Sequence, residues 1–222
     1  MNVPLLHVIA TDEAVEAPTF QAVAEDLIAA GRDRIALHLR LRRTSGRDFH
    51  ELAERLGSSA ADSGAWCVIN DRVDVALTSG AQAVQLGSGA LPVDAVLRLR
   101  GRRLAIGASV RSAGEARQRA SEGADFLVAG SVFSTATHPD RVPAGPVLVT
   151  SCVGAGVPVV GIGGIDAGNA RQVVAAGATG IAVIRAVWQA TAPVDAALRL
   201  IDVVSESGAA ESNRRSPGSR TG

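Results

Sequence analysis

The fold prediction starts from Val160-Gly161-Ile162-Gly163-Gly164-Ile165-Asp166 and from Gly180-Ile181-Ala182-Val183-Ile184-Arg185, which lies a short distance further along the chain. Both begin as short apolar runs, too short for a buried helix, and both end in polar or glycine residues. A helical stretch, Ala167–Ala176, separates them, and Gly177 follows it at the position of a helix-ending glycine. A strand, a helix and a second strand in this order predict one parallel β/α unit.

The same unit recurs along the whole chain. Helical stretches rich in Ala, Leu, Glu and Arg separate the apolar runs, and a glycine follows each of the clearest ones. Eight units predict a single-domain (β/α)8 TIM barrel over residues 1–204. An open, doubly wound sheet is the alternative, but no glycine-rich turn follows the first strand. The other predicted strands are Leu5–Ile9, Ile35–Leu39, Trp66–Ile69, Ala83–Leu86, Leu104–Gly107 and Phe126–Ala129, and the helices include Phe20–Ala30 before Gly31, Arg47–Leu56 before Gly57 and Glu115–Glu122 before Gly123.

Composition narrows the class of protein. The 222 residues carry 22 Lys+Arg and 22 Asp+Glu, and only 3% are aromatic, which argues against a nucleic-acid partner. No apolar stretch reaches the roughly 18 residues of a membrane span, and no signal peptide begins the chain. We therefore expect a cytoplasmic protein without a membrane partner. From residue 205 the sequence is rich in Ser, Gly and Glu without apolar periodicity, which predicts a disordered C-terminal tail, 205–222.

Polar residues near the ends of predicted strands are the first site candidates, because TIM-barrel active sites lie at the C-terminal strand ends. In the second strand, His38 and Arg40 alternate with Leu37 and Leu39, and Arg42 continues the polar face. Guanidinium groups suit an anionic ligand. A solvent-exposed face is the alternative interpretation of this pattern.

Further candidates follow the third, fifth and sixth strands. Asn70 and Asp71 end the third strand, where they could contact a ligand or a metal, or Asp71 could cap the next helix. The loop after the sixth strand, residues 130–140, supplies hydroxyl and imidazole groups and is long enough to close over a substrate. The other candidates at these ends are Ser109, Thr135, Thr137 and His138.

The glycine pair Gly163–Gly164 ends the seventh strand, and Ile184 and Arg185 end the eighth. TIM barrels often bind phosphate between these two loops, where glycine allows the backbone N–H groups to approach an anion. A tight turn without a ligand is the alternative. The position in the barrel favours a phosphate site.

Five motifs, in this order, resemble those of the thiamine-phosphate synthase/TenI family. The similarity runs from about residue 5 to residue 200. It implies a TIM barrel that binds a thiazole phosphate. The synthases of this family couple that compound to a hydroxymethylpyrimidine diphosphate with Mg²⁺ and release pyrophosphate, whereas TenI-type members include a tautomerase that moves protons on a thiazole phosphate carboxylate. The motifs are Arg40-Leu41-Arg42, Ile69–Asp74, Gly107–Ser109, Val132–Thr137 and Gly161–Ile165 with Asn169.

The resemblance also implies roles for individual residues. Gly164 and the backbone of Ile184 and Arg185 would hold the thiazole phosphate, with Gly163 beside them and Thr135 and Thr137 nearby. Asp71 matches a magnesium ligand of the synthases. The pyrimidine side would consist of His38, Arg40, Arg42, Asn70 and Ser109.

Departures from the synthase pattern favour the TenI branch. The chain has Ala90 where synthases have a second metal carboxylate, His138 where they have a lysine, and Leu41 where they have a glutamate. We therefore expect a thiazole tautomerase-like isomerase without a metal cofactor. Its catalytic candidates are His138, His38 and Ser131, the last standing where the tautomerase carries its histidine. A synthase with Mg²⁺ at Asp71 is the alternative, and a non-catalytic binder of thiazole or thiamine phosphates is the second. Similar barrels suggest a homodimer.

Overall fold

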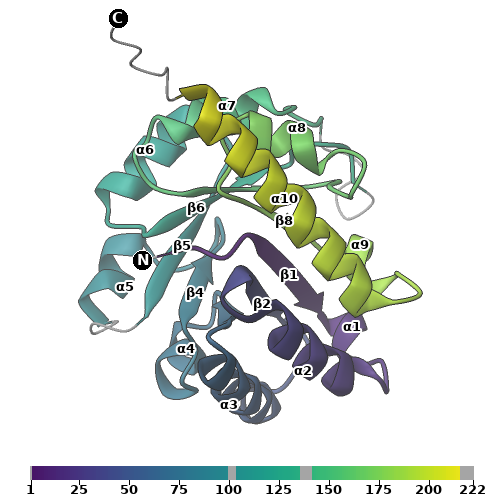
Figure 1. Ribbon diagram of the computed structural model, residues 1–222. Coiled ribbons are helices and arrows are strands. Elements are labelled where there is room, and N and C mark those ends of the chain that lie inside the picture. Colours follow the sequence, from purple (N-terminus) through teal and green to yellow (C-terminus); the bar gives the residue numbers. More distant parts are fainter. Residues whose placement is uncertain (1, 100–103, 136–141, 216–222) are drawn as a thin grey trace, which may run out of the picture.

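The protein is a closed barrel of eight parallel strands in the computed structural model, which describes residues 2–99, 104–135 and 142–215. Each strand pairs with its neighbours in the sequence, and the ring closes where β8 pairs with β1 (Figure 1). The predicted TIM barrel is confirmed. The strands are β1 (Leu6–Thr11), β2 (Ile35–Arg40), β3 (Trp66–Asn70), β4 (Ala83–Leu86), β5 (Ala105–Val110), β6 (Phe126–Gly130), β7 (Val159–Ile162) and β8 (Gly180–Val183).

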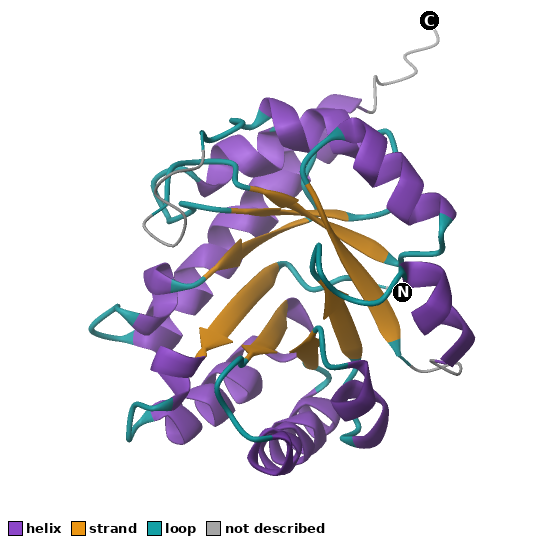
Figure 2. Cartoon of the chain, turned by 180° about the vertical axis from the view of Figure 1, so that it is seen from behind, coloured by secondary structure: helices purple, strands orange, loops and turns teal. Residues whose placement is uncertain are grey.

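Helices surround the barrel and cover the outer face of its strands (Figure 2). The last helix, α10, packs against both α8 and α2 and so joins the last unit to the first. The helices are α1 (Asp12–Val15), α2 (Phe20–Gly31), α3 (Gly46–Ser63), α4 (Val73–Thr78), α5 (Val93–Leu99), α6 (Ala113–Ser121), α7 (Val147–Val153), α8 (Ala170–Ala175), α9 (Arg185–Trp188) and α10 (Pro193–Arg215), with a short 3₁₀ helix, η1 (Arg32–Arg34).

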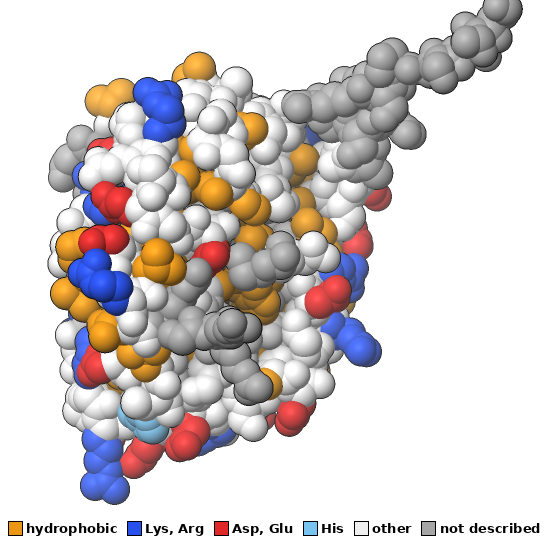
Figure 3. All heavy atoms as spheres, turned by 90° about the vertical axis from the view of Figure 1, so that its left-hand side faces the viewer, with side chains coloured by type: hydrophobic (Ala, Val, Ile, Leu, Met, Phe, Trp, Pro, Cys, Tyr) orange, Lys and Arg blue, Asp and Glu red, His pale blue; other side chains and the backbone are white. Residues whose placement is uncertain are grey.

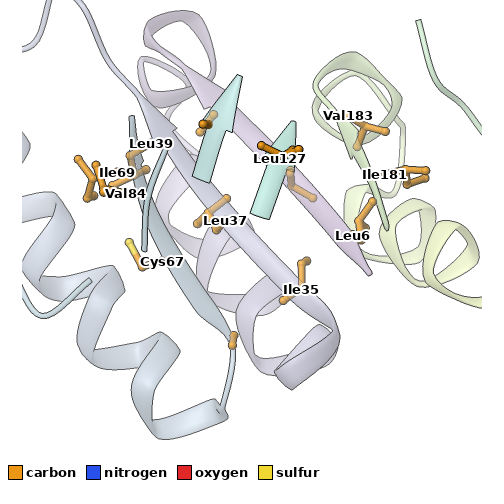
Figure 4. Packing of buried hydrophobic residues seen from close by; sticks show 14 of the residues in the cluster. Leu6, Ile35, Leu37, Leu39, Cys67, Ile69, Val84, Leu127, Ile181 and Val183 are labelled. Carbon is orange, nitrogen blue, oxygen red and sulfur yellow. The ribbon is translucent and has the colours of Figure 1, made fainter. Parts of the chain in front are cut away.

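The core has two layers because successive strand residues point to opposite faces. Leu6, Leu37 and Leu127 belong to the larger layer, between the strands and the helices (Figure 4). A second cluster, which includes Ala36 and Phe126, consists mostly of the alternate residues of the strands and fills the barrel interior. This alternation directs every second strand residue toward the barrel axis, so polar residues near the carboxyl ends of the strands meet in one place.

Two of the glycines that were predicted to follow the end of a helix, Gly57 and Gly31, instead lie within a helix in the structure. Gly57 lies inside α3, which continues to Ser63 and ends before Gly64, a residue with φ of 77°. A Cβ at Gly57 would lie 2.8 Å from the carbonyl oxygen of Ser79, so glycine permits close helix packing there. Gly31 is the last residue of α2, with φ of −80°. The residues at 123 and 177 do take positive φ values, as predicted.

The final helix extends beyond the predicted start of the tail at residue 205. Helix α10 continues through Arg215. Val204 is buried, and Glu206 forms a 2.9 Å ion pair with Arg171 of α8, so contacts with the barrel continue across the boundary. Ala209 and Ala210 are strong helix formers. Residues 216–222 of the predicted tail lie outside the described part of the chain.

The helices of the described residues include none with the length and apolarity to cross a membrane. On the face shown in Figure 3, acidic and basic side chains are interspersed with hydrophobic ones. This mixture agrees with the balanced charge of the sequence.

Candidate functional site

A pocket of about 910 Å³ lies at the carboxyl ends of the strands, and all eight strands contribute to its lining. The structure brings nearly all of the predicted site residues together there. Two of them, Thr137 and His138, fall outside the described residues. The predicted residues that line the pocket are His38, Arg40, Arg42, Asn70, Asp71, Ser109, Ser131, Thr135, Gly163, Gly164, Ile184 and Arg185.

One side of the pocket is cationic. Burial lowers the pKa of the half-buried Arg40, and the neighbouring charge of Arg42 lowers it further, while Asp71 and Asp12 act in the opposite direction. Arginine nevertheless stays charged in proteins. Two guanidinium groups that repel each other at the edge of a pocket are stabilised by an anion placed between them.

Asp12 fixes the backbone on which Arg42 stands. Its carboxylate accepts hydrogen bonds from the N–H of Arg42, at 3.0 and 3.1 Å, and from the N–H of Arg43, at 3.0 Å. The hydroxyl of Thr44 donates to the same carboxylate at 3.4 Å. Desolvation acts to raise the pKa of Asp12, but the two backbone N–H groups, the charge of Arg43 and the Thr44 hydroxyl together lower that pKa below its usual range. The carboxylate is therefore ionised at neutral pH and holds the loop after β2 in place.

Asp71 joins the ends of β3 and β4. It has φ of 63°, and its Oδ1 accepts a 2.7 Å hydrogen bond from the N–H of Gly87. A Cβ at Gly87 would lie 3.0 Å from that oxygen, which explains the glycine. The N-cap position of α4 belongs to Arg72, and no side chain caps it, so the alternative role of Asp71 as a helix cap is wrong. Its carboxylate is part of the pocket lining instead.

The loop after β7 presents bare backbone to the pocket. Gly163 and Gly164 have φ of 108° and 63°, values that favour glycine. A Cβ at Gly164 would collide with the carbonyl oxygen of Ser134, so this loop packs directly on the loop after β6. Asn169 locks the turn, because its Nδ2 donates to the Gly164 oxygen at 2.8 Å and its Oδ1 accepts from the N–H of Asp166 at 3.0 Å.

A buried histidine pair consists of His38, which lines the pocket, and His7, which does not. The Nδ1 of His7 lies 2.8 Å from the Nε2 of His38, and the Nδ1 of His38 lies 3.3 Å from the Oδ1 of Asn70. Burial lowers the pKa of His38 to about 4. Burial and the charge of His38 lower the pKa of His7 well below its usual value. Both rings are therefore neutral at pH 7, and both ring nitrogens of His38 face protein groups.

Sequence reasoning missed several residues of the site. His7 and Gln85 are polar residues within apolar strands, the same signal that singled out His38. Arg111 was missed because Ser109 was taken as the end of the fifth strand and the residues after it were not considered, whereas β5 continues to Val110 and Arg111 follows it directly. The pocket residues that the prediction omitted include Gln85, Gly87, Ser88, Gly89, Arg111, Ser134 and Asp166.

A TIM barrel with a cationic pocket at the carboxyl ends of its strands is the class of protein that the fold and the site define. The family model described as thiamine monophosphate synthase (TMP-TENI) matches residues 6–187. The chain belongs to this family.

Individual relatives and a solved structure support the same family assignment. A thiamine-phosphate synthase of Methanoculleus marisnigri is 38% identical over 81% of this chain and 85% of its own length. A bifunctional ThiM/ThiE protein of Symbiobacterium thermophilum is 47% identical over 69% of this chain, which spans 32% of that protein. The structure of a thiamine phosphate pyrophosphorylase from Pyrococcus furiosus is 36% identical, with a TM-score of 0.81, covering 93% of this chain and 98% of the other.

The comparisons overturn the expectation of a thiazole tautomerase, since several relatives are named thiamine-phosphate synthase. That expectation depended on departures from the synthase pattern at Leu41, Ala90 and His138, of which His138 lies outside the described residues. Ala90 is absent from the pocket lining and packs against the hydrophobic core, whereas Gly87, in the same loop, holds Asp71 in the pocket. The tautomerase interpretation, and the proton-carrier roles that came with it, are therefore withdrawn.

Proposed function

We propose that this protein is a thiamine-phosphate synthase, which joins a thiazole phosphate to a hydroxymethylpyrimidine diphosphate. The observation that carries the proposal is that two groups of residues suited to anions line one pocket. One group is the glycine loop Gly163–Gly164 with Arg185, and the other is Arg40 with Arg42. A synthase must hold two phosphorylated compounds at once, which two such groups would allow.

The reaction exchanges one bond for another. The ring nitrogen of the thiazole forms a bond to the methylene carbon of the pyrimidine, and the bond between that carbon and the diphosphate oxygen breaks. The electron pair leaves with pyrophosphate, so negative charge accumulates on the leaving group. Arg40, Arg42 and Arg111 line the pocket and would stabilise that charge. Holding the two substrates in line would supply much of the remaining rate enhancement.

Magnesium fits this pocket as an ion that accompanies a diphosphate. Within the described residues, no three His, Cys, Asp or Glu side chains come together as a metal site. Mg²⁺ commonly uses one or two carboxylates together with substrate phosphates and water. Asp71 is the carboxylate that would take this role, with its Oδ1 held by the N–H of Gly87. When bound, the ion supplies additional charge neutralisation to the diphosphate.

The test is synthesis of thiamine phosphate. The purified protein is incubated with both substrates and Mg²⁺, and thiamine phosphate and pyrophosphate are quantified together. We expect equal amounts of the two products. Asp71→Asn should reduce kcat/KM at least tenfold, because it removes a charged ligand of the diphosphate complex. A matched control is Asp74→Asn, since Asp74 pairs with Arg72 on the surface at 2.6 Å and is not in the pocket lining.

Two outcomes would contradict the proposal. Binding of both phosphorylated compounds by calorimetry without any product would identify a non-catalytic binder. Product formation that Asp71→Asn and Asp74→Asn reduce equally would remove the assigned role of Asp71. A cytoplasmic location and a homodimer stay predictions, and size-exclusion chromatography with light scattering tests the second.

A further inference from the structure

Three side chains form a hydrogen-bonded line from the barrel interior to the pocket. His7 of β1 contacts His38 of β2 at 2.8 Å, and His38 contacts Asn70 of β3 at 3.3 Å. At the other end, the Nε2 of His7 lies 3.1 Å from the carbonyl oxygen of Pro4. His7 is fully buried and does not line the pocket, whereas Asn70 does. The line therefore connects a buried backbone acceptor to a residue that lines the pocket.

The Pro4 carbonyl fixes the direction of every hydrogen bond in this line. A carbonyl oxygen only accepts, so the Nε2 of His7 carries the proton in that contact. Burial lowers the pKa of both histidines, so each ring is neutral and has one N–H group. The Nδ1 of His7 is then a lone pair, and it accepts from the Nε2–H of His38. The opposite direction would place a lone pair of His7 against the Pro4 oxygen.

The same logic fixes the amide of Asn70. A neutral His38 with its proton on Nε2 has only a lone pair at Nδ1, so it needs a donor at the atom 3.3 Å away. The oxygen and nitrogen of an asparagine amide exchange places by a half-turn that hardly changes the shape of the side chain. This tautomer of His38 assigns Nδ2 of Asn70 to the position facing His38 and Oδ1 to the pocket, the reverse of the placement of these two atoms in the structure. The Asn70 side chain has no other hydrogen bond within the described residues.

We propose that His7 is a positioning residue that, through His38, holds the Asn70 carbonyl oxygen toward the ligand and so selects a ligand with an N–H donor at that point. A ring amino group satisfies this requirement, and a ring carbonyl does not, because two acceptors would face each other. The identification of that group as an amino substituent on the pyrimidine diphosphate rests on the proposed function. The inferred orientation of Asn70 does not depend on the proposed function.

The first experiment reads the tautomers directly. The intact protein is labelled with ¹⁵N-histidine, and long-range ¹H–¹⁵N NMR at neutral pH reports which ring nitrogen carries each proton. Single substitutions of the histidines assign the signals. We expect His7 and His38 both as neutral Nε2–H tautomers. A His38 ring that is charged, or that carries its proton on Nδ1, would overturn the proposal whether or not the protein is a synthase.

The second experiment uses two variants of His7. His7→Leu keeps an apolar side chain of similar volume and removes the acceptor, so His38 loses its partner at Nε2 and moves its proton to Nδ1. His7→Asn keeps an amide oxygen near the position of the ring Nδ1. We expect His7→Leu to raise the KM for the pyrimidine diphosphate about tenfold or more and to leave the KM for the thiazole phosphate within about twofold of its original value. His7→Asn should restore the original KM for the pyrimidine diphosphate.

A pyrimidine diphosphate that carries a carbonyl in place of the ring amino group tests whether the effect is specific to the amino group. The parent protein should prefer the amino compound, and His7→Leu should lose at least about tenfold of that preference. Equal loss of affinity for both compounds, or for both substrates, would show a merely structural role and overturn the proposal. Calorimetry of the two pyrimidines gives the same comparison without turnover, so a failed synthase assay is distinguishable from a failed inference. If His7→Leu does not fold, the NMR result decides.

Discussion

Gly164→Ala is the substitution that tests the phosphate loop most directly. Gly164 has φ of 63°, and an L-residue in this region costs about 1–2 kcal/mol. A Cβ there would also collide with the Ser134 carbonyl oxygen and lie 2.9 Å from the Cβ of Phe133, so the loop must shift. For a chain of this size 1 kcal/mol corresponds to about 2–4 °C, so the backbone cost alone lowers Tm by about 2–8 °C.

The displaced loop should weaken phosphate binding as well. A hydrogen bond to a charged group contributes about 1.5–3 kcal/mol, so losing one lowers the affinity for the thiazole phosphate at least tenfold. Scanning fluorimetry and titration calorimetry measure the two effects. Gly154→Ala is the matched control, because Gly154 has φ of −63° and nothing within 4 Å of its Cβ position. A folded Gly164→Ala protein with reduced Tm and unchanged affinity for the thiazole phosphate would refute the assignment of this loop.

Three other perturbations have defined outcomes. Mg²⁺ should strengthen pyrophosphate binding at least tenfold in calorimetry and should have no such effect in Asp71→Asn, and an equal effect in both proteins would contradict the role of this carboxylate. Acidification should destabilise the fold, since an unfolded histidine takes its proton near pH 6.5 while the pKa of the buried His38 is about 4. The contribution of neutral, buried His38 is fully present above pH 6.5 and falls by about 3 kcal/mol toward pH 4, and the lowered pKa of His7 acts in the same direction. Urea unfolding would measure the fall, and a slope that His38→Gln leaves unchanged would count against this account. Gly57→Ala should lower Tm because its Cβ would meet the Ser79 oxygen at 2.8 Å, a cost of about 1–3 kcal/mol that exceeds the helix-propensity gain of about 1 kcal/mol. Gly208→Ala, with open space at its Cβ position in α10, should raise Tm, and a rise for both would contradict the packing argument.

The fold was predictable because its signal is local and repeated. Every strand of the barrel contains one short apolar run, and a parallel neighbour requires a crossover between successive runs. Helix ends were less predictable. The role of Gly57 depends on the Ser79 carbonyl 22 positions away in the chain, a contact that no pattern around position 57 contains. The last helix likewise continues past residue 205 through contacts with α8.

The site was predictable to the extent that the barrel rule applies. Residues near strand ends, such as Arg40, Asn70 and Gly164, converge because parallel strands end on the same side. His7 was missed because it lies deep within a strand, where its role depends on a partner in β2 and on the Pro4 carbonyl. The branch of the family was misjudged because departures at single positions, such as Ala90, were given more weight than the similarity of the chain as a whole, which relates it to synthases.

The contacts between the first and the last β/α unit have a consequence for how the chain folds. Strand β8 pairs with β1, and α10 rests on α2, so these contacts join segments about as far apart in the sequence as the chain allows. A ribosome releases the residues of β1 long before those of α10. The ring stays open until β8 has emerged, so we expect closure to follow the synthesis of all eight strands and to be the slowest step of folding.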